Sequence, residues 1–143
     1  MSENQSTSEP QLPPQANATI DTIVQYIVIR RDLMQPPYSY AIGSIVSQGS
    51  HASVSIISES LLIDKDPITL NYVDANAIHQ MHTIVLECPS EKQLLSLRDD
   101  LDKNQMKYKL WVEQPENIPT SIALKPYPRS LVAKFVKKFK LFK

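Results

Sequence analysis

The polar residues best suited to chemistry recur at helical spacing in one stretch, residues 43–53. Ser44, Gln48 and His51 are four and three residues apart, so an α-helix would place them on one face. Beside a sheet, a row of uncharged polar groups can line a pocket near the carboxyl ends of strands. The same spacing suits a helix face that only contacts solvent, and spacing alone favours that simpler interpretation. Since changes on exposed helix faces are usually mild, we expect substitutions at Gln48 or His51 to alter stability little.

Other residues point to fewer kinds of chemistry. The two glycines, Gly43 and Gly49, do not form a Gly-rich phosphate loop. The three histidines lack acidic or cysteine partners at metal-site spacing, so we expect neither a metal nor a cofactor. No Gly-x-Ser-x-Gly elbow accompanies the serines near His51, which argues against a Ser–His hydrolase. Glu113, at the end of an expected strand, is the better candidate acid or base, and the alternative is an exposed loop carboxylate.

Composition indicates one folded domain that follows a tail. The chain has 143 residues, of which 42% are hydrophobic and 21% charged, ordinary values for a globular protein. Residues 1–19 are rich in Ser, Gln, Asn, Thr and Pro, so we expect a disordered tail and a domain over residues 20–143. The sequence shows no membrane-spanning run and no secretory or mitochondrial signal. One cysteine, Cys88, cannot form an intramolecular disulfide, and we expect a cytoplasmic protein with no membrane partner.

The chain has a net charge of zero, but its C-terminal segment is strongly basic. Residues 125–143 include seven basic residues and no acidic one. Residues 129–139 are expected to form an amphipathic helix whose inner face includes Leu131 and whose outer face carries Lys134, Lys137 and Lys138. Such a patch is a candidate contact for a phosphate backbone, and the alternative is a solvated helix face.

The hydrophobic pattern predicts the elements that must position these side chains. Residues 20–31 are apolar on both faces, as in a buried central strand. A Pro-rich loop over residues 32–40 leads into the helix that carries Gln48. This helix begins near residue 41 and extends to about residue 57 or a little beyond. The helix side expected against the sheet consists of Ile45, Gly49, Ala52 and Ile56. Further strands are expected at residues 83–87, 108–112, 121–124 and 141–142, and further helices at residues 69–80, 91–104 and 129–139. This order predicts an α/β domain with a mixed four- to five-stranded sheet sandwiched between helices.

Two segments stand in a distinctive order, Val28-Ile29-Arg30-Arg31-Asp32-Leu33 and, after a loop, Gly43-Ser44-Ile45-Val46-Ser47-Gln48-Gly49-Ser50-His51-Ala52. This order resembles the signature of the archaeal and eukaryotic type of peptidyl-tRNA hydrolase. In that family a strand ending in Arg-x-Asp-Leu precedes a helix with Gly-Lys-Ile-Ala-Ala-Gln-Cys-x-His-Ala. The resemblance covers residues 25–143 and is closest to the subgroup called peptidyl-tRNA hydrolase domain-containing protein, whose hallmarks match residues 110–118 and 137–143.

The resemblance implies hydrolysis of the ester that joins a peptide to the tRNA 3′ end, with tRNA as the partner. It places a catalytic site at Glu113, Gln48, His51, Thr120 and Ser44. The RNA-binding candidates are Arg30, Arg31, Lys134, Lys137 and Lys138. A homodimer is also among the expected assemblies.

The departures from the family pattern fall at the site itself. The family's helix lysine is Ser44 here, its cysteine is Gly49 and its aspartate is Glu113. Loss of a fixed cation weakens stabilisation of an anionic transition state by an amount on the order of several kcal/mol. Two interpretations therefore stand: an active hydrolase, or a family member that has lost hydrolysis and binds RNA or a protein partner.

Overall fold

The apolar run near the start of the chain forms the central strand of the sheet. The computed structural model describes residues 21–143, so the tail predicted at residues 1–19 lies outside the described residues. β1 (Ile23–Arg30) pairs in parallel with β2 (Thr83–Cys88) and antiparallel with β4 (Ile118–Leu124). β3 (Tyr108–Glu113) extends the sheet beyond β4, and β6 (Lys140–Leu141) extends it beyond β2. The main sheet order is therefore β3-β4-β1-β2-β6.

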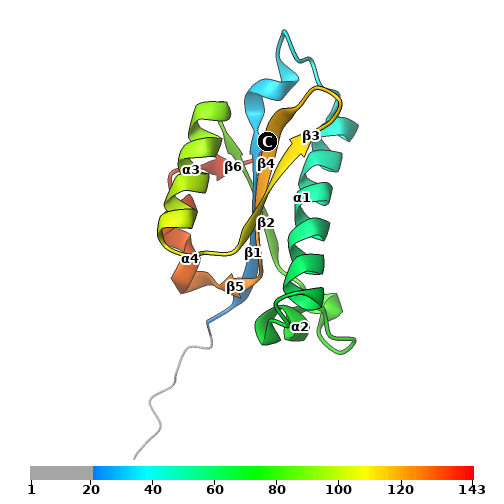
Figure 1. Cartoon of the computed structure of the whole chain (residues 1–143), viewed down its shortest axis with the longest axis vertical. Helices are drawn as coiled ribbons and strands as arrows, with labels where there is room; N and C mark the ends of the chain where they lie inside the picture. The colour runs from blue at the N-terminus through cyan, green and yellow to red at the C-terminus, as the bar shows by residue number, and fades with distance from the viewer. Residues whose placement is uncertain (1–20) are drawn as a thin grey trace, which may run out of the picture.

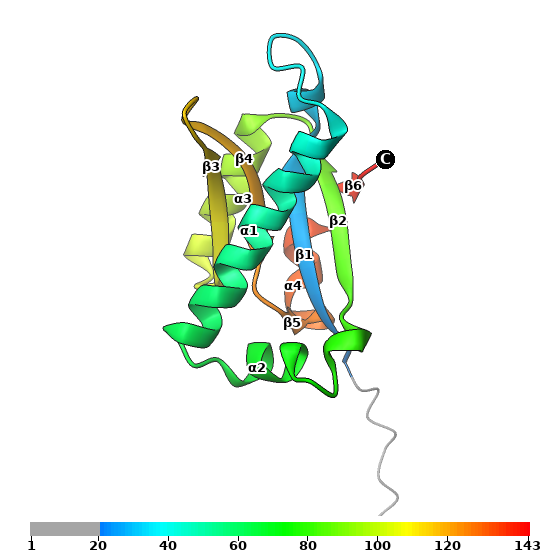
Figure 2. The same ribbon diagram turned by 90° about the vertical axis from the view of Figure 1, so that its right-hand side faces the viewer.

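Helices cover both faces of this sheet, as Figure 1 shows in a view along its edge. α3 (Glu91–Lys103) and α4 (Arg129–Val136) pack on one face, and α1 (Ile42–Leu62) packs on the other. α2 (Pro67–Val73) follows α1 at the lower end of the molecule (Figure 2). The prediction of a mixed sheet sandwiched between helices is confirmed.

Alternation along β1 explains why its sequence is apolar on both faces. Val24, Tyr26 and Val28 point into the core beneath α3 and α4. Ile27 and Ile29 point into the second core, beneath α1. Because successive strand residues face opposite sides of a sheet, a strand covered on both sides reads as a continuous apolar run.

α1 approaches β1 closely at Gly49. A Cβ atom at this position would lie 3.0 Å from Ile29 Cδ1, which is tighter than an ordinary contact. Ile45, Ala52 and Ile56 are buried on the same side of the helix, as predicted. The small residues on this side, Gly49 and Ala52, therefore let the axis of α1 lie near the sheet.

Several predicted boundaries are wrong. The loop at residues 32–40 overlaps a short 3-10 helix, Arg31–Met34, and α1 continues to Leu62. The helix expected at residues 69–80 begins at Pro67, with Asp66 as its N-cap, and ends at Val73; a separate 3-10 turn covers Ile78–Gln80. The start of α2 is set locally, because the Asp66 side chain caps the helix and Pro67 suits its first turn. β-branched residues weaken the local signal in α1, so packing on the sheet sets its far end.

The C-terminal segment also differs from expectation. The last helix ends at Val136, and Leu131, predicted to face inward, is 47% exposed. Residues 127–128, for which no strand was expected, form the short strand β5 (Tyr127–Pro128), which pairs with the start of β1. This two-residue strand raises the total to six. Among the described helices, none combines the length and the apolar character needed to cross a bilayer.

Candidate active site

A polar cavity of about 370 Å³ lies between the first half of α1 and the loop that follows β3. Figure 2 shows α1 crossing the sheet face while the β3–β4 hairpin rises beside it. The residues that line the cavity are Tyr40, Ser44, Ser47, Gln48, His51, Glu113, Gln114 and Glu116. Four of the five predicted catalytic residues therefore share one cavity, and the fifth, Thr120, lies directly behind Gln48.

Gln48 connects the strand residue to the carboxylate. Thr120 Oγ1 donates a hydrogen bond of 2.8 Å to Gln48 Oε1, and Gln48 Nε2 donates to a carboxylate oxygen of Glu113. Ser121 Oγ also donates to the backbone carbonyl of Gln48, at 2.8 Å. Each end of the Gln48 amide thus has a fixed partner, and the amide in turn fixes Glu113.

The burial of Gln48 corrects the expectation of a solvated helix face. Gln48 is 2% exposed and Thr120 is 0% exposed, whereas Ser44 and His51 on the same helix face are exposed. Removing one partner of a buried hydrogen bond leaves the other unsatisfied, which costs stability. Substitution of Gln48 is therefore expected to destabilise the fold, and only His51 fits the mild change anticipated from sequence.

Glu113 is the acid or base best placed for chemistry. It ends β3, and its side chain accepts hydrogen bonds from Gln48 Nε2 and from the backbone N–H of Gln114, the latter at 3.2 Å. The side chain remains partly exposed at the cavity. A carboxylate that is oriented by two donors and still reaches solvent can accept a proton from a bound water.

His51 is held by an aromatic neighbour. Its ring stacks on Trp111, with centroids 4.7 Å apart and planes inclined by 27°. Trp111 lies two positions before Glu113 in β3, so strand alternation could have indicated that both side chains face α1. Tyr40 was also missed, because it belongs to the irregular segment before α1, for which the sequence offers no periodicity.

Arg30 does not lie at an accessible surface. It is 1% exposed, donates two hydrogen bonds to Asp32 at 2.8 and 3.0 Å, and donates a third to the carbonyl of Pro119 at 2.9 Å. Its contact with Pro119 ties the end of β1 to β4, next to Thr120. Arg30 is thus placed to support the site from within, while the neighbouring Arg31 side chain is 40% exposed.

The basic C-terminal residues lie apart from the cavity. Lys134 is on α4, and Lys137 and Lys138 directly follow it; all three are exposed. α4 covers the sheet face opposite α1 (Figure 1). The structure therefore brings the predicted catalytic residues together but does not bring the lysines to them.

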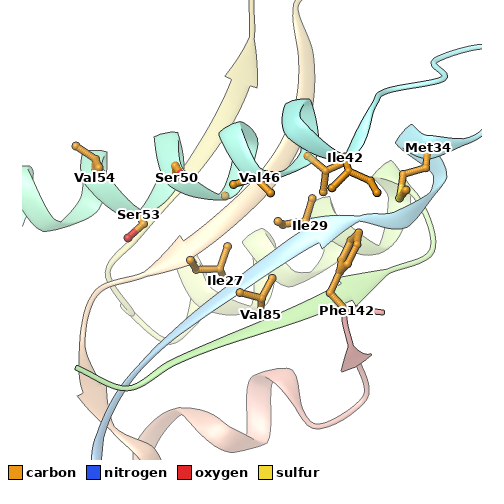
Figure 3. Close-up of a pocket in the computed structure, with 12 residues that line it drawn as sticks. Ile27, Ile29, Met34, Ile42, Val46, Ser50, Ser53, Val54, Val85 and Phe142 are labelled. Carbon is orange, nitrogen blue, oxygen red and sulfur yellow. The ribbon is translucent and has the colours of Figure 1, made fainter. Parts of the chain in front are cut away.

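A larger cavity, of about 430 Å³, lies along the other side of α1 (Figure 3). Val46 of α1 faces Ile29, Val85 and Phe142 across it, and Val54 lines it farther along the helix. Its lining contains no acid, base or thiol, so it does not offer the groups for hydrolysis. Among residues 21–143, no three His, Cys, Asp or Glu side chains gather closely enough to hold a metal ion.

Similarity to known proteins extends over almost all of the described chain. The family model described as "Peptidyl-tRNA hydrolase PTH2" matches residues 23–142. The Homo sapiens protein named "Putative peptidyl-tRNA hydrolase PTRHD1" is 40% identical over 129 residues, which cover 90% of this chain and 88% of that protein. The Mus musculus protein of the same name is 41% identical over 122 residues, covering 85% and 83%.

Proposed function

The chain belongs to the peptidyl-tRNA hydrolase PTH2 family, and we propose that it hydrolyses the ester bond between a peptide and the 3′ end of tRNA. The observation that best supports this proposal is the hydrogen-bonded series from Thr120 through Gln48 to Glu113. It orients a carboxylate in a polar cavity, where the carboxylate can act as the general base toward a bound water.

In the proposed reaction, Glu113 accepts a proton from water while the water oxygen attacks the ester carbonyl carbon. The resulting oxyanion then re-forms the carbonyl, and the bond to the ribose oxygen breaks. The ribose oxygen leaves with the bond's electron pair and takes the proton from Glu113. Ser44 and His51 contribute polar groups that bind the substrate in the cavity, and Trp111 keeps the His51 ring in place.

Single-turnover hydrolysis of purified peptidyl-tRNA tests this function. Glu113→Gln should lower the rate by about 10²–10⁴-fold, the usual contribution of a general base. Glu116→Gln is the matched control, because Glu116 lines the same cavity and is exposed. It should not lower the rate, since Glu116 takes no part in the proton transfer. Equal rates for Glu113→Gln and wild type would contradict the assignment of Glu113.

A binding module without hydrolysis is the second candidate function. Two carboxylates, Glu113 and Glu116, line the cavity, and none of its described lining residues is Lys or Arg. This charge is unfavourable for an anionic transition state. Wild-type protein that binds tRNA with no single-turnover hydrolysis would favour this second function.

The proposed partner is tRNA, held outside the cavity by exposed basic residues. Arg31, Lys134, Lys137 and Lys138 are assigned to the phosphate backbone, because their side chains are accessible. Arg30 was predicted from sequence as an RNA contact. Because its guanidinium is enclosed by Asp32 and Pro119, we propose that it instead holds β4 in position next to Thr120.

The proposed setting is translation quality control in the cytoplasm, within a domain that spans residues 20–143. Peptidyl-tRNA esters arise where ribosomes work, and the family membership supports this assignment.

We also propose a homodimer. It is supported by exposed apolar side chains beside the larger cavity, with Ile42, Val46 and Val54 between 60% and 71% exposed. Light scattering in solution measures the mass of the assembly, and a monomer mass would refute the homodimer.

A further inference from the structure

Tyr40 lines the polar cavity and carries a buried hydroxyl. Its oxygen is inaccessible to solvent and has no hydrogen-bond partner among the described residues. Tyr40 lines the cavity together with Gln48, His51 and Glu113. Buried hydroxyls without a partner are rare in native proteins, and they often indicate a place where a ligand or water completes the hydrogen bond.

The backbone and ring of Tyr40 are held by neighbouring residues, although its hydroxyl has no hydrogen-bond partner among the described residues. The Tyr40 N–H donates to the carbonyl of Leu33 at 2.7 Å, which anchors the segment before α1. The ring packs against the core beneath α1, which includes Leu33 and Ile45. An anchored donor loses little orientational freedom when it binds a developing charge, and such preorganisation favours electrostatic stabilisation.

Three other cavity donors are committed within the protein. Ser47 Oγ donates to the carbonyl of Gly43 at 3.0 Å, and Gln114 Nε2 donates to Asn117 Oδ1 at 3.2 Å. Gln48 Nε2 donates to Glu113. Tyr40 is thus a lining residue that combines an anchored position with an uncommitted O–H; Ser44, whose hydroxyl also lacks a partner among the described residues, is exposed to solvent.

The phenol of Tyr40 keeps its proton at neutral pH. Burial raises the pKa of Tyr40 above its ordinary value, and the negative charges of Glu116 and Glu113 raise it further. Tyr40 therefore acts as a hydrogen-bond donor and does not act as a base.

We propose that Tyr40 is a catalytic residue whose O–H donates a hydrogen bond to the oxyanion that forms from the ester carbonyl. This inference rests on the proposed hydrolysis. When the water oxygen bonds to the carbonyl carbon, the carbonyl π electrons move to its oxygen, and Tyr40 stabilises that negative charge without giving up its proton. The carbonyl then re-forms, the ribose oxygen departs with the bonding pair, and the proton on Glu113 is transferred to it.

Tyr40→Phe tests this role, because it removes the O–H and keeps the ring. Loss of one oxyanion donor should lower the single-turnover rate by about 10²–10³-fold. The dissociation constant for uncharged tRNA should stay within about twofold, because the donor acts on the reacting ester. The thermal midpoint should not fall, since the hydroxyl has no partner in the described structure to lose. This combination separates a catalytic role from a structural one.

Tyr26→Phe is the matched control away from the site. Tyr26 is buried in the core beneath α3 and α4, and it does not line the cavity. Its rate should remain within about threefold of wild type. If wild type hydrolyses peptidyl-tRNA and Tyr40→Phe does so at an equal rate, the role of Tyr40 is overturned and the proposed function stands. Absence of wild-type hydrolysis would overturn the proposed function and this inference with it. Rates are measured well below the lowest thermal midpoint, so that folding does not limit them.

Discussion

Replacing Thr120 with valine should lower both stability and rate, because it removes the hydroxyl that holds Gln48. Valine has nearly the same shape as threonine and is favoured in strands, so β4 should form normally. The Gln48 amide oxygen, in a side chain that is 2% exposed, would lose its donor from Thr120. An unsatisfied buried polar group costs about 1–3 kcal/mol. At about 4 °C per kcal/mol for a domain of this size, the thermal midpoint should fall by roughly 4–12 °C.

The rate effect follows from the orientation of Glu113. Without Thr120 Oγ1, the Gln48 amide is free to turn away from the carboxylate, and Glu113 loses a fixed donor. Small displacements of a catalytic group can cost about 10²-fold in rate, so we expect a loss of about 10- to 100-fold in single-turnover hydrolysis.

Thr120→Ser is the control for this prediction. It keeps the hydroxyl and removes one methyl group, at a cost of about 1 kcal/mol in stability. Its hydrolysis rate should stay within about threefold of wild type. The reasoning fails if Thr120→Val hydrolyses peptidyl-tRNA as fast as Thr120→Ser, because the hydroxyl would then not orient the site.

Two further predictions concern charged groups away from the cavity. Burial would raise the pKa of Asp66, but hydrogen bonds from Thr69 and Lys125 outweigh it and leave the pKa below the ordinary value of 3.8. Its stabilising effect is therefore complete above the unfolded-state pKa and is lost as pH falls through the lower folded-state pKa. Thermal unfolding should show a larger drop between pH 5 and pH 3 for wild type than for Asp66→Asn, and equal drops would contradict the linkage. Replacing Lys134 and Lys138 with glutamine should flatten the dependence of log affinity for tRNA on log salt by about two units. Because these residues lie across the sheet from the cavity, the rate at saturating enzyme should stay unchanged; an unaltered salt slope would remove them from the RNA surface.

Elements with strong local periodicity could be predicted from the sequence. The run of β1 that is apolar on both faces identified the central strand, and the leucines of α3 identified a helix with one buried side. Short elements were less predictable. The exposure of Leu131 and the pairing of β5 with β1 depend on which surface the chain meets, and local residues do not carry that information.

The sequence by itself determined that Ser44, Gln48 and His51 share a helix face, because the 3.6-residue period fixes their directions. Only the tertiary structure decided that Gln48 is buried while its two neighbours are exposed, since Glu113 and Thr120, 65 and 72 residues away, come to it through the packing of α1 on β3 and β4. Likewise, the concentration of lysines near the end of the chain was evident from the sequence, although α4 ends before Lys137 and Lys138. Their separation from the cavity arises because α4 joins α3 on the opposite face of the sheet, where Val132, Phe135 and Val136 complete the first core. The amphipathic pattern of a helix shows that one of its sides must be buried. The order and connections of the strands decide which face of the sheet that side packs against.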